Sequence, residues 1–488
     1  MLSGRIRSGR AEHFAIDVDY AEWTFLQMND VYELMPLNNG QDGGLARVAA
    51  IQKRLMNENR QTYTFLAGDF VSPSALSQAK VNGTALNGKQ MISSLNAVGV
   101  NYVTFGNHEF DLKRNDLIQR MRESNFSWLG TNVFERSTTS MFNTAVRYEI
   151  INVKKVKILI FSYSTDLNIG GSSPYVTIMN GTSMIPFIQR FLQSLRIKYD
   201  VLVALTHCDL KMDIALAEGI PQIDIIMGGH DHENYYLVRG ERGTRICKAD
   251  ANAFSVYIHR FAFNLYTRKL FVDSKLVRIT PEIPDDFLTA SVVKKWFSMG
   301  MDAFTKSGFR PYDTVVTFPV GVELDGRDSS IRYHATLLTD YICKSLMYET
   351  NATVGLYNTG SIRIDDVVKG KLTNYDILRI LPFEDEVVKL QVPGAVLARV
   401  LTHSVSTPGG GMFLSYCGVK SIDGKNWVLE SDGVTNIEKN NNLMLTVGTL
   451  DYTQNETDLK NPRVTLIKTF DPIAVTVMKY FRLLYKSK

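Results

Sequence analysis

The sequence predicts an α/β protein with two domains. In the first half of the chain, short apolar strands alternate with amphipathic helices, and the strands repeatedly end in polar clusters. After about residue 280 this alternation gives way to a differently ordered mixture of strands and helices. Repeated βα units imply a mostly parallel sheet, and 488 residues are too many for one core. We therefore expect an N-terminal extension at 1–22, a first domain at 23–280, a linker helix at 281–311 and a second domain at 312–488.

The strands of the first domain are apolar runs that end in glycine or polar residues. WTFLQM leads to Asn29 and Asp30, TYTFLAG to Asp69, NYVTFG to Asn107 and His108, DVLVALT to His207, and IDIIMGG to His230, Asp231 and His232. Between them, GGLARVAAIQKRLMNEN and MIPFIQRFLQSLRIK have the apolar spacing of helices. Ligands of parallel sheets gather beyond the carboxyl ends of the strands. Five polar strand ends therefore predict one shared site.

The contents of these strand ends favour a metal site. They offer oxygen and imidazole ligands and no thiolate, namely Asp30, Asp69, Asn107, His207, His230 and His232. Carboxylate and imidazole suit Mn, Zn, Fe, Co or Ni better than a structural zinc, which usually recruits cysteine. Four of the eight histidines fall in these clusters. A single Asn-His after a strand is more often a turn or a cap, but five such endings together indicate metal binding.

Composition excludes several other classes of protein. The chain has 54 basic and 50 acidic residues and no sustained basic stripe, which argues against nucleic acid as the main partner. The start, MLSGRIRSGRAEHF, lacks the apolar run of a secretory signal, and no segment approaches the roughly 18 uninterrupted apolar residues of a membrane helix. The four cysteines are widely spaced, as is typical of unpaired thiols in a reducing compartment. We expect a cytoplasmic protein without a membrane partner, and no sequence feature points to a protein partner.

The motifs also resemble those of a known family. GD, GNHE and GH-x-H, in this order, are similar to the motifs of calcineurin-like metallophosphoesterases. The longer runs GNHEFD, LTH and GGHDHE resemble the 5′-nucleotidase family, which includes UDP-sugar hydrolases and cyclic-nucleotide phosphodiesterases. This resemblance implies a four-layer α/β/β/α sandwich that holds two metal ions. The implied ligands are Asp69 as the bridge, Asp30 and His232 for the first ion, and Asn107, His207 and His230 for the second.

The resemblance also implies a mechanism. His108, oriented by Asp111, would face the phosphate and either stabilise its charge or protonate the leaving oxygen. A metal-bound hydroxide would attack phosphorus, and the ions would stabilise the attacking and departing charge. The cofactors expected are two metal ions, drawn from Mn, Zn, Co and Fe. Either both ions are divalent, or one of them is trivalent.

Tyr32 departs from that family pattern. The first motif is usually Asp-x-His, but here it reads Asp30-Val31-Tyr32. A phenol has a reference pKa of about 10 and ligates readily only to a metal acidic enough to deprotonate it, such as trivalent iron. Alternatively, Tyr32 hydrogen-bonds to a ligand and leaves the first ion weakly held. We favour a two-metal site with altered metal preference over a weakened or mononuclear site, because every other ligand is present.

The second half of the chain is expected to bind the substrate. VVTFPVGVEL predicts a strand, HATLLTDYICKSLM a helix, TVGLYN a strand and PGAVLARVLTHSV a helix. LDGRDSSIRYHATLLTDYI, YNTGSIR, LTNYDILRILPFEDEVVKLQVPGAVL and GGGMFLSYCG resemble the C-terminal nucleotide-binding domain of the same family. By that resemblance Arg332 and Arg363 contact phosphate, Asn358 contacts the base edge, and Phe413 forms one face of a base-stacking clamp. The run GTLDYTQNETDLKNP lacks the glycine-rich, aromatic second wall of that clamp, for which Tyr452 is the candidate replacement.

These features predict a metal-dependent phosphohydrolase. Its expected substrate is a small-molecule phosphoester, namely a nucleotide, from which it removes the terminal phosphate. Two other activities keep the same metal site, namely cyclic-nucleotide phosphodiesterase and nucleotide-sugar hydrolase. A third alternative is a degenerate family member that binds nucleotide without catalysis. Tyr32 and the altered clamp support this last alternative, whereas the otherwise intact set of ligands opposes it.

Overall fold

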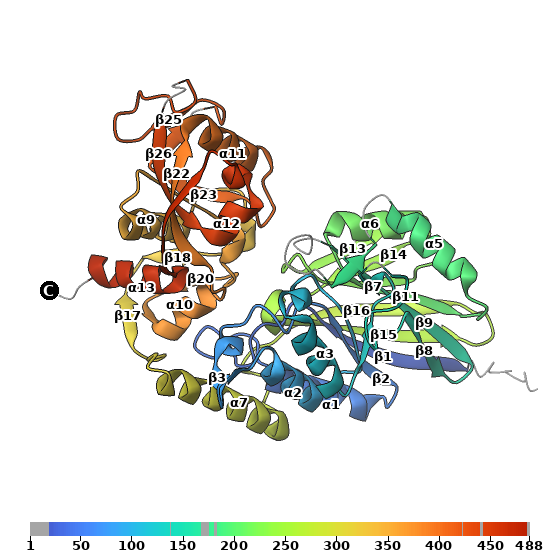
Figure 1. Cartoon of the computed structure of the whole chain (residues 1–488). Coiled ribbons are helices and arrows are strands. Elements are labelled where there is room, and N and C mark those ends of the chain that lie inside the picture. The colour runs from blue at the N-terminus through green and yellow to red at the C-terminus, as the bar shows by residue number, and fades with distance from the viewer. Residues whose placement is uncertain are drawn as a thin grey trace, which may run out of the picture.

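The structure is a computed structural model that describes residues 19–136, 138–166, 175–179, 183–421, 423–439 and 443–485. Most of the predicted N-terminal extension lies outside these residues. We call the elements from β1 to β16 the first domain and those from β17 to α13 the second domain. In Figure 1 the helix α7 (Phe287–Lys306) runs beside the first domain and leads into the second. Among the described residues, no helix combines the length and the apolar character needed to span a membrane.

The first domain contains two six-stranded sheets. In the first sheet the order is β16-β15-β1-β2-β5-β6, and β1, β2, β5 and β6 are parallel. Its strands are β1 (Tyr20–Met28), β2 (Thr62–Ala67), β5 (Tyr102–Thr104), β6 (Ser127–Leu129), β15 (Ser255–Asn264) and β16 (Leu270–Arg278). The strand β1 therefore lies between β2 and β15. It pairs with β2 in parallel and with β15 in antiparallel register.

The second sheet has the order β13-β14-β12-β11-β9-β8, with a parallel centre formed by β9, β11, β12 and β14. Its strands are β8 (Tyr148–Val153), β9 (Val156–Ser164), β11 (Val201–His207), β12 (Ile225–Gly228), β13 (Tyr235–Arg239) and β14 (Thr244–Lys248). Two short ribbons, β3 (Lys80–Val81) with β4 (Thr84–Ala85) and β7 (Val133–Glu135) with β10 (Val176–Ile178), lie outside both sheets.

The two sheets pack face to face and carry helices on their outer faces. Alternate residues of β1 show this clearly, because Trp23 and Phe25 join the core between the sheets, whereas Leu26 and Met28 join the core under the helices. The helices over the first sheet are α1 (Leu45–Glu58), α2 (Lys89–Val98) and α3 (Arg114–Glu123). Those over the second are α5 (Met184–Ser194) and α6 (Leu210–Gly219). The predicted α/β/β/α sandwich is confirmed.

The second domain is built on a mixed five-stranded sheet with the order β23-β19-β26-β22-β27. Its strands are β19 (Val354–Asn358), β22 (Glu386–Pro393), β23 (Leu414–Cys417), β26 (Met444–Leu450) and β27 (Thr465–Pro472). Its helices are α8 (Asp328–Ile331), α9 (Leu337–Thr350), α10 (Asn374–Ile380), α11 (Gly394–Ser406), α12 (Asp451–Glu456) and α13 (Ile473–Leu484). Smaller strands are β17 (Thr314–Thr317), β18 (Glu323–Asp325), β20 (Val367–Lys369), β21 (Lys371–Thr373), β24 (Val419–Ser421) and β25 (Trp427–Leu429).

Two expectations for this domain are wrong. The single strand predicted at VVTFPVGVEL is two strands, β17 and β18, separated by Pro319, which cannot donate to a ladder, and by Gly321 with φ of 90°. Cys343 and Cys417 form a disulfide, with their Cα atoms 6.1 Å apart, whereas Cys208 and Cys247 are free, as predicted. Spacing along the chain could not reveal this pair, because 74 residues separate the two cysteines and the packing of α9 against β23 brings them together.

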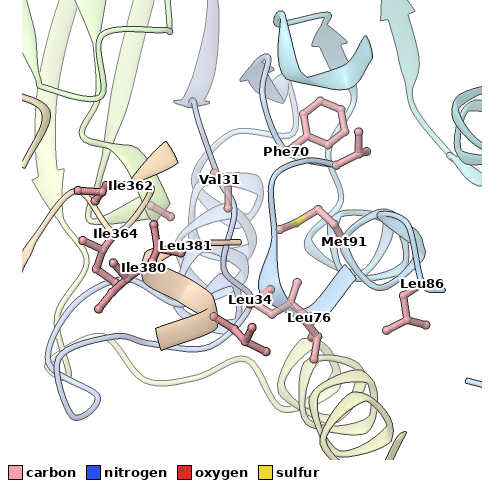
Figure 2. Packing of buried hydrophobic residues seen from close by; sticks show 14 of the residues in the cluster. Val31, Leu34, Phe70, Leu76, Leu86, Met91, Ile362, Ile364, Ile380 and Leu381 are labelled. Carbon is pink, nitrogen blue, oxygen red and sulfur yellow. The ribbon is translucent and has the colours of Figure 1, made fainter. Parts of the chain in front are cut away.

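The two domains share one continuous hydrophobic cluster. Figure 2 shows Ile362, Ile364, Ile380 and Leu381 of the second domain packed in the same cluster as residues of the first domain, including Val31, Leu34 and Leu76. All seven side chains are at most 4% exposed. We call this cluster the interdomain seam. It lies directly after Asp30 and on both sides of Arg363, so it fixes how the second domain meets the predicted metal site.

Candidate metal centre and active site

The predicted ligands lie where the strands of both sheets of the first domain end. Asp30, Asp69 and Asn107 follow β1, β2 and β5, whereas His207 ends β11, and His230 and His232 follow β12. Four of these residues have positive φ, namely Asp30 (52°), Asp69 (55°), His230 (88°) and His232 (62°). Residues other than glycine rarely adopt this conformation, which costs energy and concentrates at functional sites.

Asp30, Asp69 and His207 form the centre of the cluster. One ligand atom from each lies within 4.8 Å of the others, and all three side chains are almost completely buried. The Nε2 atom of His207 is 3.2 Å from Asp69 Oδ2. Burial would raise the pKa of Asp69, but the facing imidazoles of His207 and His108 lower it well below its usual range. Burial would likewise lower the pKa of His207, yet Asp69 and Asp30 raise it to about 10. The cluster therefore attracts positive charge strongly.

The donor set fits divalent metal ions. Asp30 Oδ1 and Asn107 Oδ1 are buried acceptor atoms without a hydrogen-bond partner among the described residues. Burying such atoms without a partner is costly, and carboxylate, amide and imidazole ligands suit Mn, Zn, Co or Fe. His230 completes the group, with Nδ1 3.3 Å from His207 Nε2 and Nε2 3.3 Å from Asp209 Oδ1. Sequence reasoning did not single out Asp209, although it lies only two residues beyond His207.

His108 and Asp111 form the predicted pair beside these ligands. The His108 Nδ1 atom is 2.8 Å from Asp111 Oδ2, which also accepts from the Ser72 hydroxyl at 2.9 Å. The His108 backbone N–H donates to Asp69 Oδ1 at 2.9 Å, so the pair is attached directly to the central carboxylate. The imidazole is oriented by one carboxylate, and this arrangement suits a proton donor.

Tyr32 lies against the same cluster but is shared with the second domain. Its hydroxyl is 3.2 Å from Asp69 Oδ2 and 3.1 Å from His232 Nε2, and it accepts from Arg363 Nη2 at 2.9 Å. The Arg363 guanidinium also lies over the Tyr32 ring, 5.3 Å from its centroid. Burial, followed by the charge of Asp69, raises the pKa of Tyr32 well above its ordinary value, against a smaller lowering by Arg363. These surroundings therefore oppose loss of the phenol proton.

Two buried charged residues hold the loops that carry the ligands, and the first is Glu109. Its carboxylate accepts from the backbone N–H groups of Gly106, Asp69 and Phe70 at 2.6, 2.9 and 2.8 Å. Burial, together with Asp69, raises the pKa of Glu109 to about 7. Glu109 thus joins the loops after β2 and β5.

Lys248 does the same for the loops of the second sheet. Its ammonium donates to the carbonyls of Cys208 and Gly229 at 2.6 and 2.8 Å and pairs with Asp213 at 2.9 Å and with Asp231. These carbonyls directly follow His207 and precede His230. Sequence reasoning assigned no role to Glu109 or Lys248. Glu109 stands inside GNHEFD, but Lys248 ends an ordinary-looking strand and gives no local signal.

Two cavities meet at this site. The first, of about 180 Å³, is lined by the ligand cluster and by residues of the second domain, among them Asp69, Asn107, His108, His230, His232, Asp328, Arg332 and Arg363. The second, of about 220 Å³, is lined by His108, Asp111, Arg332, Asn358, Arg363, Phe383, Asp385, Met412 and Tyr452 among others. Three residues, His108, Arg332 and Arg363, line both. The cavities therefore adjoin across these side chains.

The predicted substrate residues are placed unequally. Arg332, Arg363 and Asn358 line the second cavity, and Asn358 Oδ1 accepts from the Thr453 hydroxyl at 2.8 Å. Phe413 is only 8% exposed and is not among the residues that line this cavity. The aromatic rings that line it are those of Phe383 and Tyr452. Tyr452 is the predicted replacement for the missing wall, whereas Phe383 stands within one of the family-like runs and was not singled out.

The comparisons with known proteins agree with this geometry. Residues 24–234 match the family of calcineurin-like phosphoesterases, and residues 315–469 match the 5′-nucleotidase C-terminal domain. A snake venom 5′-nucleotidase from Crotalus adamanteus is 23% identical over 454 residues, with 82% of this chain and 73% of that protein covered.

Among solved structures, a 5′-nucleotidase precursor from Thermus thermophilus superposes with a TM-score of 0.79 at 19% identity, covering 95% of this chain and 97% of that one. The sulfate thiohydrolase SoxB, also from Thermus thermophilus, reaches a TM-score of 0.71 at 14% identity, with 95% and 94% covered. Likeness at these identities shows the fold alone. The chain therefore joins a calcineurin-like phosphoesterase domain to a 5′-nucleotidase C-terminal domain, and relatives called 5′-nucleotidase align along most of its length.

Proposed function

We propose that the protein removes the terminal phosphate of a nucleotide at a site that holds two divalent metal ions. The observation that carries this proposal is the shared wall of the two cavities. His108, Arg332 and Arg363 line both the cavity of the ligand cluster and the aromatic-lined cavity. A ligand whose planar ring occupies the second cavity would therefore place its anionic end between two guanidinium groups and beside the metal ligands.

Each residue has a definite part in this proposal. Two divalent ions, held by Asp30, Asp69, Asn107, His207, His230 and His232, would activate water and neutralise phosphate charge when bound. Arg332 and Arg363 orient the phosphate. His108 protonates the leaving oxygen, and Asp111 keeps the imidazole in the required orientation. Phe383 and Tyr452 offer faces on which a base can stack, and Asn358 lies at the same cavity.

The charged groups of the second cavity suit a ligand with an anionic end and a ring that forms hydrogen bonds. Two guanidinium groups lie on its wall toward the metal ligands, whereas Asp385 lies on the same cavity together with the aromatic rings. Burial, followed by the charges of Asp451 and Asp111, raises the pKa of Asp385 to about 7. A carboxyl group with a raised pKa can both donate and accept hydrogen bonds, and a nucleobase edge offers matching groups.

Phosphate release tests the proposal directly. The purified protein is treated with EDTA and dialysed, and Mn, Zn, Co, Mg or Fe is then restored before addition of AMP, other nucleoside monophosphates, cyclic AMP, a UDP-sugar or an aryl phosphate. We expect metal-restored release from a nucleoside monophosphate, and none from the matched variant Asp69→Asn. Release from cyclic AMP or a UDP-sugar instead would assign one of the two alternative activities. A folded protein that stays inactive with every metal and substrate would favour binding without catalysis.

Tyr32 allows a test of metal preference. We expect Tyr32→His to tighten binding of the more weakly held ion by about tenfold or more, because an imidazole would replace a neutral phenol that only donates and accepts hydrogen bonds. Tyr32→Phe is the matched variant, and we expect it to keep two ions while losing the 2.9 Å contact with Arg363. Calorimetric titration with Mn²⁺ and Zn²⁺ measures the number of bound ions and their affinities in both variants. Loss of one ion in Tyr32→Phe would instead identify the phenol as a ligand.

A further inference from the structure

His232 lies where the metal ligands meet the second domain, and each of its ring nitrogens faces a different domain. Its Nε2 atom is 3.5 Å from Asp30 Oδ1 and 3.1 Å from the Tyr32 hydroxyl, both in the first domain. Its Nδ1 atom is 3.3 Å from Asp365 Oδ2 and 3.5 Å from Asp328 Oδ2, both in the second domain. The His232 side chain is only 3% exposed. The ring is therefore enclosed between carboxylates that come from opposite sides of the domain boundary.

Asp365 is held in place by its own surroundings. Its Oδ1 atom accepts from the backbone N–H of Asp328 at 2.9 Å, which leaves Oδ2 facing His232. Its backbone has a positive φ of 43°, a conformation that aspartate and asparagine tolerate better than most residues. Asp328, by contrast, is paired with Arg332 at 2.5 Å. Asp365 is thus the carboxylate with an oxygen available to the imidazole.

The interdomain seam fixes this carboxylate relative to His232. Ile364, the residue before Asp365, is buried in the seam and appears in Figure 2 beside Ile362 and Ile380. A second polar contact crosses the boundary nearby, where Arg379 Nε pairs with Glu33 at 2.8 Å. The contact between Asp365 and His232 is therefore a consequence of how the domains are docked.

We infer that Asp365 is a positioning residue for the metal centre. The Nδ1 atom of His232 is buried without a hydrogen-bond partner among the described residues, and Asp365 Oδ2, at 3.3 Å, is the carboxylate oxygen placed to accept its proton when a metal ion is bound. With that proton on Nδ1, the lone pair of Nε2 faces Asp30 and the predicted metal position. Carboxylate partners of this kind orient metal-binding histidines and increase their basicity, and their removal typically costs about 10–100-fold in metal affinity. The second domain would thus contribute to metal binding as well as to substrate binding. This inference rests on the proposed function, because it needs a metal at the Asp30 cluster.

Metal affinity tests the inference without a need for turnover. Asp365→Asn keeps an oxygen for the Asp328 N–H and a side chain suited to positive φ, but it presents an amide N–H to His232 Nδ1 in place of an acceptor. Asp366→Asn is the matched control, because Asp366 is the adjacent aspartate and its Oδ1 accepts from the backbone of Val367. We expect Asp365→Asn to weaken one of two bound Mn²⁺ ions by about 10–100-fold in competition with a chelator, whereas Asp366→Asn binds both ions as the unmodified protein does.

The possible outcomes separate the inference from the proposed function. If the unmodified protein binds two ions and Asp365→Asn binds both equally tightly, the inference is wrong and the proposed function stands. If the unmodified protein binds no ion, the proposed function itself fails. If Asp365→Asn does not fold, Asp365→Gly gives the same test, because glycine adopts positive φ freely. NMR of the protein with ¹⁵N-labelled histidine adds a spectroscopic measurement. We expect the proton of the His232 ring on Nδ1 in the metal-loaded unmodified protein, and we expect this tautomer to be lost in Asp365→Asn.

Discussion

We expect His108→Ala to lower kcat for a nucleoside monophosphate by about 10²–10⁴-fold, the range typical of a lost general acid. The imidazole is 10% exposed, is oriented by Asp111 at 2.8 Å, and lines both cavities. It contributes no ligand to the predicted metal cluster, so the variant should bind two ions as before. KM should change far less than kcat, because the proton is transferred only as the bond to the leaving oxygen breaks.

The leaving group shows how His108 acts. An aryl phosphate with an acidic phenol needs little protonation as it departs, so His108→Ala should reduce its turnover much less than that of a nucleoside monophosphate. His334→Ala is a suitable control, because His334 is exposed in the second domain. An equal loss for both substrates would mean that His108 stabilises charge on the phosphoryl group and donates no proton. Unchanged turnover of both would remove His108 from the proposed mechanism.

We expect Lys248→Met to destabilise the protein by about 3–5 kcal/mol, the usual cost of removing one partner from a buried charge cluster. The ammonium is 1% exposed, and its loss leaves Asp213 and Asp231 buried without their cation. Burial would lower the pKa of Lys248, but Asp213 and Asp231 raise it well above its ordinary value. Because the pKa of this lysine is higher in the folded than in the unfolded protein, its contribution to the free energy of unfolding is fully present at any pH below the unfolded pKa of about 10.4. The whole effect is therefore present at neutral pH and is lost only as the pH rises above that value.

Urea unfolding at pH 7 measures this cost. Lys479→Met is the matched control, because Lys479 is an exposed lysine that pairs with Asp471 at 2.8 Å, and such surface pairs contribute about 0–1 kcal/mol. We also expect Lys248→Met to weaken metal binding, since the ammonium joins the carbonyls after His207 and before His230. Stability within about 1 kcal/mol of the control would show that the two carboxylates find protons or other partners.

The cluster of candidate ligands was predictable from the sequence because its members stand at the ends of five strands. Asp30, Asp69 and His207 are marked by a local change from apolar to polar residues, and the parallel sheet brings such ends together. The roles of Lys248 and Asp365 depend instead on side chains that meet across long stretches of chain. Their own neighbours in sequence carry no sign of those contacts. The same holds for Phe413, whose surroundings are decided by how β23 packs rather than by the run GGGMF.

The position of β1 between β2 and β15 has a consequence for synthesis of the chain. β1 pairs with β15 from Tyr20 opposite Asn264 to Gln27 opposite Tyr257, so its antiparallel neighbour leaves the ribosome more than two hundred residues later. Until then β1 has one unpaired edge, and its residues include the buried Trp23, Phe25 and Leu26. Open apolar edges pair readily with other chains, and such distant pairings form slowly. The strand that presents Asp30 is therefore made early and completed late, and its open edge is exposed to pairing with other chains throughout that interval.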